Sequence, residues 1–179
     1  MTVTSVLGHV FERDFDEATG GDPVHLFGAR TAKAVEGASQ KHGIPGMLAA
    51  EAVGADYLFL WLDCDREGEN ICFEVLDILR SAGSTLAAPG GSKAPGSADY
   101  GCHVPDSCYR AKFSALNAEA IKRAWHRPAR LDPAVSDSVD LRQELDLKVG
   151  CSFTRLLNRR LLAAARAAAR DEALRVISP

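Results

Sequence analysis

The sequence lacks the features of membrane-spanning and disulfide-stabilised chains. Its longest strongly apolar run, residues 57–62, is far shorter than the roughly 18–20 residues that cross a bilayer. The N-terminus has neither a basic start nor a long apolar stretch, so we expect no signal peptide. The 5 cysteines include no C-x-x-C pair, which favours reduced thiols inside a cell over a disulfide framework or a zinc knuckle. We therefore expect no membrane association.

Charge is distributed unevenly along the 179 residues. Residues 1–80 carry 6 Lys and Arg against 14 Asp and Glu, a formal charge of −8, and residues 81–179 carry 15 against 10, a charge of +5. A cation site beside a polyanion-binding surface produces such a split, and so do two differently solvated faces. Composition leaves both interpretations open.

Residues 81–106 are rich in Gly, Pro and Ser and divide the chain. This composition predicts a flexible insertion between a first domain, residues 1–80, and a mainly helical segment, residues 107–179. In that segment, residues 117–125 have an amphipathic pattern, and Pro128 and Pro133 predict an extended break. Asp140 and Gln143 resemble a capping pair, which predicts a helix from Asp140 onward.

This last helix has apolar residues four apart, at Leu141, Leu145, Val149 and Phe153. The spacing puts them on one helix face and predicts that this face belongs to the core. Polar side chains would occupy the other face.

The clearest local pattern is an apolar strand that leads directly into acidic residues. Residues 57–62 are typical of a strand buried on both faces in a parallel α/β sheet, and a helical pattern follows up to Arg80. Functional groups gather at the carboxyl ends of such strands. Asp63, Asp65 and Glu67 alternate, so in an extended segment their carboxylates would project to one side and could share Mg²⁺. Arg66 could pair with the acids or steady a neighbouring phosphate.

Two other interpretations of the acidic turn remain. Residues 63–74 have the spacing of an EF-hand calcium loop, with Gly68 at position six and Glu74 at position twelve. An EF-hand needs a helix before the loop, whereas residues 57–62 have the pattern of a strand. A solvated acidic turn without a ligand is the simpler alternative.

Four stretches occur in the order found in one enzyme family. Residues 60–76, around the acidic turn, resemble the second acidic motif of a TOPRIM domain from type IA DNA topoisomerases, in particular eukaryotic topoisomerase III of the beta type. Residues 4–10 resemble the Gly-His segment of that domain. Residues 109–116 resemble the strand that enters the next domain, and residues 138–155 are similar to the helix that lines the single-strand DNA groove.

The resemblance implies an α/β fold: a TOPRIM (Rossmann-like) parallel-sheet domain, incomplete, followed by the start of the helical topoisomerase core. It implies ATP-independent breakage, passage and rejoining of single DNA strands, which relaxes negative supercoils. By match to the family, Asp63, Asp65 and Glu67 would bind Mg²⁺. The residues that match positions in contact with DNA are His9, Arg142, Gln143 and Asp146.

The chain also departs from the family. Residues 1–7 contain no acid where the family has a strand with a glutamate, so that strand is expected to be missing. Tyr57, Tyr100 and Tyr109 are the only tyrosines, and none matches the nucleophile. We therefore expect this chain alone to be inactive, a fragment of a nuclear topoisomerase.

The alternative is a non-enzymatic module that binds single-stranded nucleic acid. The expected partners are single-stranded DNA, with RNA left open, and the accessory helicase or OB-fold and Tudor-type proteins of topoisomerase III.

Overall fold

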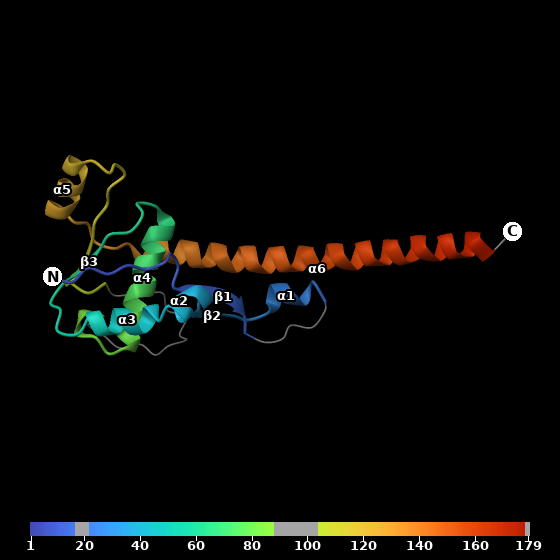
Figure 1. Ribbon diagram of the computed structural model, residues 1–179, viewed down its shortest axis with the longest axis horizontal. Helices are drawn as coiled ribbons and strands as arrows, with labels where there is room; N and C mark the ends of the chain where they lie inside the picture. The colour runs from blue at the N-terminus through green and yellow to red at the C-terminus, as the bar shows by residue number, and fades with distance from the viewer. Residues whose placement is uncertain (17–21, 88–103, 178–179) are drawn as a thin grey trace. The chain divides into compact units, whose positions relative to one another are not determined.

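The computed structural model describes residues 1–16, 22–87 and 104–177, with side chains up to residue 169. Its elements combine short strands with helices, as the predicted α/β class requires (Figure 1). Their bounds in chain order are β1 Phe11–Phe15, α1 His25–Gly28, β2 Thr31–Val35, α2 Gly37–Lys41, α3 Ile44–Glu51, β3 Leu58–Leu60, α4 Arg66–Ser81, the 3-10 helix η1 Thr85–Ala87, β4 Cys108–Arg110, α5 Ala118–His126 and α6 Pro133–Ile177.

The chain divides into two compact units. The first contains residues 1–12 and 33–142, and the second contains residues 13–32 and 143–179. Most of the predicted insertion at residues 81–106 lies outside the described residues. Its two flanks belong to the first unit, because β3 before the insertion pairs with β4 after it.

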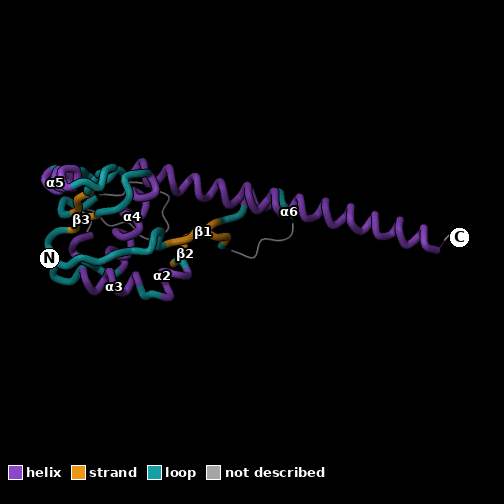
Figure 2. The backbone as a smooth tube through the Cα atoms, turned by 45° about the horizontal axis from the view of Figure 1, so that its top comes forward, coloured by secondary structure: helices purple, strands orange, loops and turns teal. Residues whose placement is uncertain are grey.

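The strands form two small sheets, drawn in orange in Figure 2. One sheet joins β1 to β2, and the other joins β3 to β4 in parallel, with Leu58 opposite Cys108 and Leu60 opposite Arg110. Parallel strands need a crossover connection, and α4 lies in the chain between these two. This β-α-β order confirms the α/β fold expected of a Rossmann-like domain.

Helix α4 supplies much of the core of the first unit. Its apolar residues recur at helical spacing, as predicted, and the helix runs to Ser81. It starts earlier than the apolar pattern, at Arg66, because Asp65 caps it. The buried core residues around it include Val10, Leu48, Leu60, Cys72, Val75, Leu76, Leu79, Leu86 and Cys108.

Helix α5 follows the predicted pattern, and α6 does not. Asn117 caps α5 by accepting a hydrogen bond from the amide of Ala120. Pro133 is the first residue of α6, a position where its missing N–H costs nothing. The carboxylate of Asp132 accepts from the amide of Ala134 at 3.0 Å, so the cap lies eight residues before the predicted one at Asp140.

The apolar face predicted for this helix is wrong. Leu141, Leu145 and Phe153 are 58%, 60% and 56% exposed. The residues of α6 that are buried in the first unit are Ser136 and Val139. Within the described residues, no helix combines the length and apolar character needed to span a bilayer.

Candidate functional site

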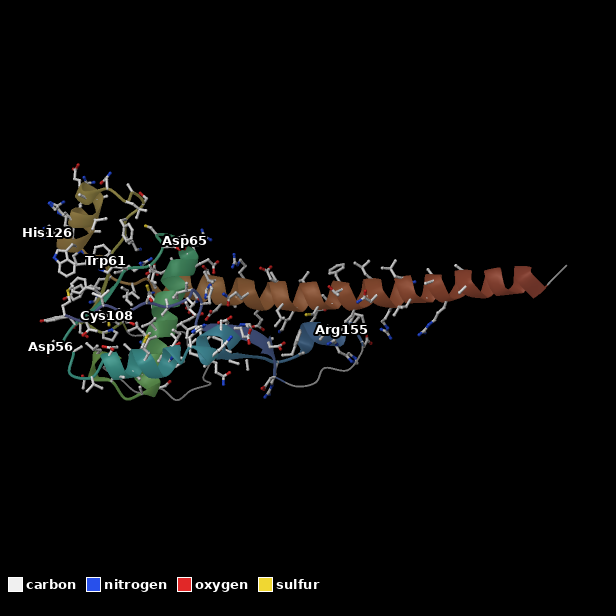
Figure 3. The ribbon with its side chains drawn as sticks, viewed as in Figure 1. Asp56, Trp61, Asp65, Cys108, His126 and Arg155 are labelled. Carbon is white, nitrogen blue, oxygen red and sulfur yellow. The ribbon has the colours of Figure 1, made fainter. Side chains whose placement is uncertain are left out.

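The acidic turn, residues 63–65, joins the carboxyl end of β3 to the start of α4. Asp65 has extended backbone geometry, and its Oδ1 accepts from the amide of Gly68 at 2.7 Å. This bond satisfies one of the amides that a helix start leaves unpaired. Asp63 and Asp65 are exposed, and Figure 3 labels Asp65 at the start of α4. The turn therefore presents two carboxylates at the end of a parallel strand.

Glu67 does not belong to the same extended segment. It lies in the first turn of α4, so the alternation that aligns Asp63 with Asp65 ends before it. Its two oxygens contact an arginine and a histidine: Oε1 lies 2.6 Å from Arg142 Nη2, and Oε2 lies 3.0 Å from His9 Nε2. The geometric argument for three converging carboxylates is therefore wrong for Glu67.

A buried arginine fixes the backbone of the acidic turn. Arg110, in β4, is completely buried. Its Nη1 donates to the carbonyl oxygen of Leu62 at 2.8 Å, and its Nη2 donates to the carbonyl oxygen of Asp63 at close range. Charge-assisted hydrogen bonds of this kind are strong and directional. Arg110 therefore determines where β3 ends and how the turn leaves it.

Glu69 balances the charge of Arg110. Its Oε2 lies 3.2 Å from Arg110 Nε, and only 3% of the Glu69 side chain is exposed. Its Oε1 accepts from the amide of Asp132 at 2.7 Å, and Lys112 Nζ lies 3.7 Å from Oε2. One carboxylate thus ties α4 to β4 and to the residue that caps α6.

Gly68 allows the turn to pass close to α4. A Cβ at this position would overlap the carbonyl oxygen of Asp63 and lie 3.1 Å from Arg110 Nη2. The absence of a side chain therefore lets α4 start directly beneath the turn.

His9 joins the Gly-His segment to α4. Its Nδ1 lies 3.0 Å from Glu74 Oε1, and Glu74 Oε2 accepts from the amide of Val10 at 2.7 Å. The pKa of His9 is raised, mainly by the hydrogen bond to Glu74, which outweighs the lowering effect of burial, and further by Glu67. His9 thus bridges two glutamates.

The EF-hand alternative is wrong. A strand, β3, precedes the turn, and α4 has already begun at Arg66. Glu74, the expected twelfth ligand, is buried against Val10 and His9. Residues 63–74 therefore do not form a calcium loop.

The predicted DNA-contacting residues fall into two groups. His9, Arg66 and Arg142 belong to the first unit, where His9 and Arg142 meet at Glu67. Gln143 and Asp146 follow in α6 and belong to the second unit.

Sequence reasoning missed the structural importance of Arg110 and Glu69. The only signal was an arginine in the motif at residues 109–116 and a second glutamate after Glu67.

A cavity of about 270 Å³ lies beside the acidic turn. Three cationic side chains and two carboxylates contribute to its wall, and two of the cations, Arg66 and Lys112, are exposed. Such a wall suits an anionic group held near a metal. The lining residues are Cys64, Asp65, Arg66, Glu69, Arg110, Lys112 and Val135.

The acidic turn offers oxygen donors of the kind that bind Mg²⁺. Among the residues that the structure describes, no three His, Cys, Asp or Glu side chains come together as a metal cage. Mg²⁺ usually takes one or two protein carboxylates and keeps several waters. Asp63 and Asp65 fit that requirement, because both are exposed carboxylates on one turn.

Comparison with known proteins agrees with this architecture. Residues 1–91 match the Toprim domain family. The chain is 41% identical over 157 residues to DNA topoisomerase 3-beta of Drosophila melanogaster and 40% identical over 157 residues to DNA topoisomerase 3-beta-1 of Homo sapiens. It is 39% identical over 159 residues to DNA topoisomerase 3 of Dictyostelium discoideum. These matches cover 86–87% of this chain and 16% of each relative.

The match to the Toprim family includes β3, the acidic turn, all of α4 and the His9 segment. The remaining similarity extends beyond it, because the matches to the topoisomerases cover most of the chain. The resemblance predicted from four short motifs is therefore confirmed. The chain belongs to the Toprim domain family, and most of its length is similar to DNA topoisomerase 3-beta proteins.

Proposed function

We propose that this chain supplies the metal-binding acids and part of the single-strand DNA path of a type IA DNA topoisomerase. The parent activity is ATP-independent breakage, passage and rejoining of one DNA strand, which relaxes negative supercoils. The observation that carries the proposal is the acidic turn, in which Arg110 fixes the backbone carbonyl of Asp63 at the carboxyl end of a parallel strand. The family match supports the same assignment.

In this proposal, Asp63 and Asp65 hold Mg²⁺. Bound there, the cation would supply positive charge to the oxygens of a phosphodiester. Asp65 keeps one oxygen on the amide of Gly68, which orients the carboxylate. In the structure, the two oxygens of Glu67 contact Arg142 and His9. Glu67 becomes a third metal ligand only if one of these contacts is replaced by a contact to the cation.

The cationic side chains near the turn would bind the DNA backbone. Arg66 lines the cavity beside the acids, and 57% of the Arg142 side chain is exposed. Contacts of this type position a strand without reading its sequence. His9 positions Glu67 from the other side. We propose that Gln143 and Asp146, in the second unit, also contact DNA.

We further propose that the isolated chain does not relax DNA. Tyr57 and Tyr109 lie among other aromatic rings, and Tyr100 lies outside the described residues. Purified chain with Mg²⁺ is expected to leave a negatively supercoiled plasmid unchanged on an agarose gel. Relaxation that is lost on Asp65→Ala would contradict this expectation.

Metal binding can be measured directly by titrating Mn²⁺ and following its electron paramagnetic resonance signal. The Asp63→Asn and Asp65→Asn variants are expected to lose binding. Asp56→Asn is the matched control, because Asp56 is an exposed aspartate just before β3, at the opposite end of the strand (Figure 3). Equal binding by all three variants would exclude the acidic turn as the metal site.

A second candidate function is a non-enzymatic module for single-stranded nucleic acid. Arg142 favours it, because its side chain is 57% exposed although it contacts Glu67, and a guanidinium binds phosphate without a metal. Salt-dependent binding of an oligonucleotide in EDTA, lost on Arg142→Ala but kept on Asp63→Asn, would support this candidate. The proposal retains three further parts: RNA as a substrate, accessory helicase or OB-fold and Tudor-type partners, and a nuclear location.

A further inference from the structure

One face of the β3–β4 sheet carries aromatic rings that the proposed function does not use. Alternate residues of a strand project to the same face, and here three of them, just before, within and just after β3, are aromatic. Rings from β4, from the segment after it and from α5 join them. We call this set the aromatic row; its members are Tyr57, Phe59, Trp61, Tyr109, Phe113 and Trp125.

The rings of the aromatic row form a continuous series. Phe59 lies at the centre, with its ring centroid 5.2 Å from that of Tyr109 and 4.9 Å from that of Trp125. Trp61 continues the series, 6.2 Å from Trp125 and inclined to it by 29°. Tyr57 lies 6.2 Å from Tyr109 at the other end. These separations are typical of stacked and tilted aromatic pairs.

Much of the aromatic row faces solvent. Tyr57 is 65% exposed, Trp125 is 43% exposed and Trp61 is 36% exposed. Contiguous apolar patches on a protein surface often mark interaction sites, whereas single exposed apolar residues are normal. Phe59 is half-buried and stacks against the rings of Tyr109 and Trp125.

Cationic side chains flank the aromatic row. Residues 112–130 contain five Lys and Arg and one acid, Glu119. The guanidinium of Arg130 lies 6.0 Å from the ring centroid of Tyr109. Lys122 precedes Trp125 by three residues in α5 and therefore lies on the same side of the helix. A single-stranded polyanion with flat apolar groups complements both the rings and the positive charge of this surface.

We propose that the aromatic row binds the bases of a single-stranded nucleic acid by stacking, while the flanking cations contact its phosphates. Stacking on exposed rings is tolerant of sequence, because every base has a π-face. The part of the row that follows β3 reaches Trp61, two residues before Asp63. Bases held there belong to the strand whose phosphate approaches the acidic turn, so the inference rests on the proposed function and adds a contact to it.

The chain offers a local reporter for this contact. Its 2 tryptophans, Trp61 and Trp125, both belong to the aromatic row. Tryptophan fluorescence is measured on the full chain in EDTA, with three ligands: a twelve-residue oligothymidylate, an abasic deoxyribose-phosphate oligomer of the same length, and a duplex. We expect strong quenching by oligothymidylate and little by the abasic oligomer or the duplex, whose bases are missing or paired.

Substitutions separate stacking from charge. Trp61→Ala and Tyr57→Ala are expected to weaken oligothymidylate binding about tenfold each, as measured by anisotropy of a labelled oligomer. Trp61→Phe retains a ring and should retain most of the affinity. Phe27→Ala is the control, because Phe27 is 49% exposed but lies outside the aromatic row. Circular dichroism verifies folding, and the highly exposed Tyr57 carries the test if Trp61→Ala does not fold.

The outcomes distinguish this inference from the proposed function. Equal affinity for the abasic oligomer, or unchanged binding by both Trp61→Ala and Tyr57→Ala, overturns stacking even if Asp63→Asn abolishes metal binding. Quenching that persists in Asp63→Asn and Asp65→Asn, which bind no Mn²⁺, supports the inference independently of the metal. No quenching by any oligomer overturns it and leaves the row to a protein partner.

Discussion

Arg110 Nε lies 3.2 Å from Glu69 Oε2, and both side chains are almost completely removed from solvent. A buried ion pair adds little compared with well-packed apolar residues, but removing one partner leaves an uncompensated charge. Here the same guanidinium also holds the carbonyl oxygens of Leu62 and Asp63. The pair therefore links the stability of the first unit to the geometry of its acidic turn.

Arg110→Ala should lower the free energy of unfolding by about 3–5 kcal/mol, because it leaves Glu69 charged and buried. Urea denaturation followed by circular dichroism measures the change. Arg123→Ala is the control, since Arg123 pairs with Glu119 on the surface, where such pairs contribute about 0–1 kcal/mol. Similar losses of unfolding free energy in both variants would show that the buried Arg110–Glu69 pair matters no more to stability than an exposed pair.

Gly68→Ala should destabilise the chain by about 1–3 kcal/mol, because the new methyl group would overlap the carbonyl oxygen of Asp63. Gly46→Ala, in α3, has no atom within 4 Å of the added Cβ and should not lower stability. Thermal denaturation of the two variants compares them directly. A stable Gly68→Ala variant would mean that the turn is looser than the structure indicates.

Asp65→Asn should separate the two roles of Asp65. Asparagine is as good an N-cap as aspartate, whereas alanine costs about 0.5–2 kcal/mol. We therefore expect Asp65→Asn to unfold near the wild-type urea midpoint while losing Mn²⁺ binding, and Asp65→Ala to lose both. Retention of Mn²⁺ binding by Asp65→Asn would remove Asp65 from the proposed ligand set.

His9 should make stability depend on pH. Because its folded-state pKa is raised above the ordinary value of 6.5, folding favours the protonated imidazole. The resulting stabilisation is fully present below the unfolded pKa and is lost as pH rises through the folded pKa. The stability difference between wild type and His9→Gln should therefore shrink upward from pH 6.5, as measured by urea denaturation at several pH values. A stability difference between the two proteins that does not change with pH would contradict this expectation.

The cysteines should differ in reactivity. Burial raises the pKa of the Cys72 thiol to about 12 and also raises that of Cys108, whereas Cys64 is exposed on the acidic turn. Iodoacetamide at pH 8, followed by peptide mapping, should label Cys64 well before Cys72 or Cys108, because the thiolate is the reactive form. Rapid labelling of Cys72 in the folded chain would indicate local opening of the core around α4.

Local patterns predicted the elements but not the contacts between them. The strand before Asp63, the helix up to Arg80 and the amphipathic helix predicted over residues 117–125 follow from hydrophobic spacing, which acts over a few residues. The predicted start of α6 was wrong, because Asp140 resembles a helix cap but makes tertiary contacts instead. Its carboxylate lies 2.9 Å from Asn70 Nδ2 and 2.7 Å from Lys33 Nζ. Sequence spacing does not reveal such partners.

The same distinction between local patterns and tertiary contacts applies to the candidate site. Asp63 and Asp65 could be identified because they follow a buried strand, and His9 and Arg142 because they lie in motifs that resemble a family. That His9 and Arg142 would meet at Glu67 could not be predicted, since the three residues are far apart in sequence. Apart from its place in the motif at residues 109–116, Arg110 gave no local signal, because a buried arginine becomes recognisable only when its carbonyl partners are known.

The acidic turn depends on contacts that close long loops. Arg110 reaches Glu69 across 41 residues, and His9 reaches Glu74 across 65. A synthetic peptide that contains only β3, the turn and α4 would keep the Asp65 cap but lose the groups that fix the carbonyls of Leu62 and Asp63. The smallest piece able to reproduce the turn therefore runs from His9 at least to Asp132, whose amide completes the bonding of Glu69. Grafting the acidic motif alone into another protein would transfer its charges without their arrangement.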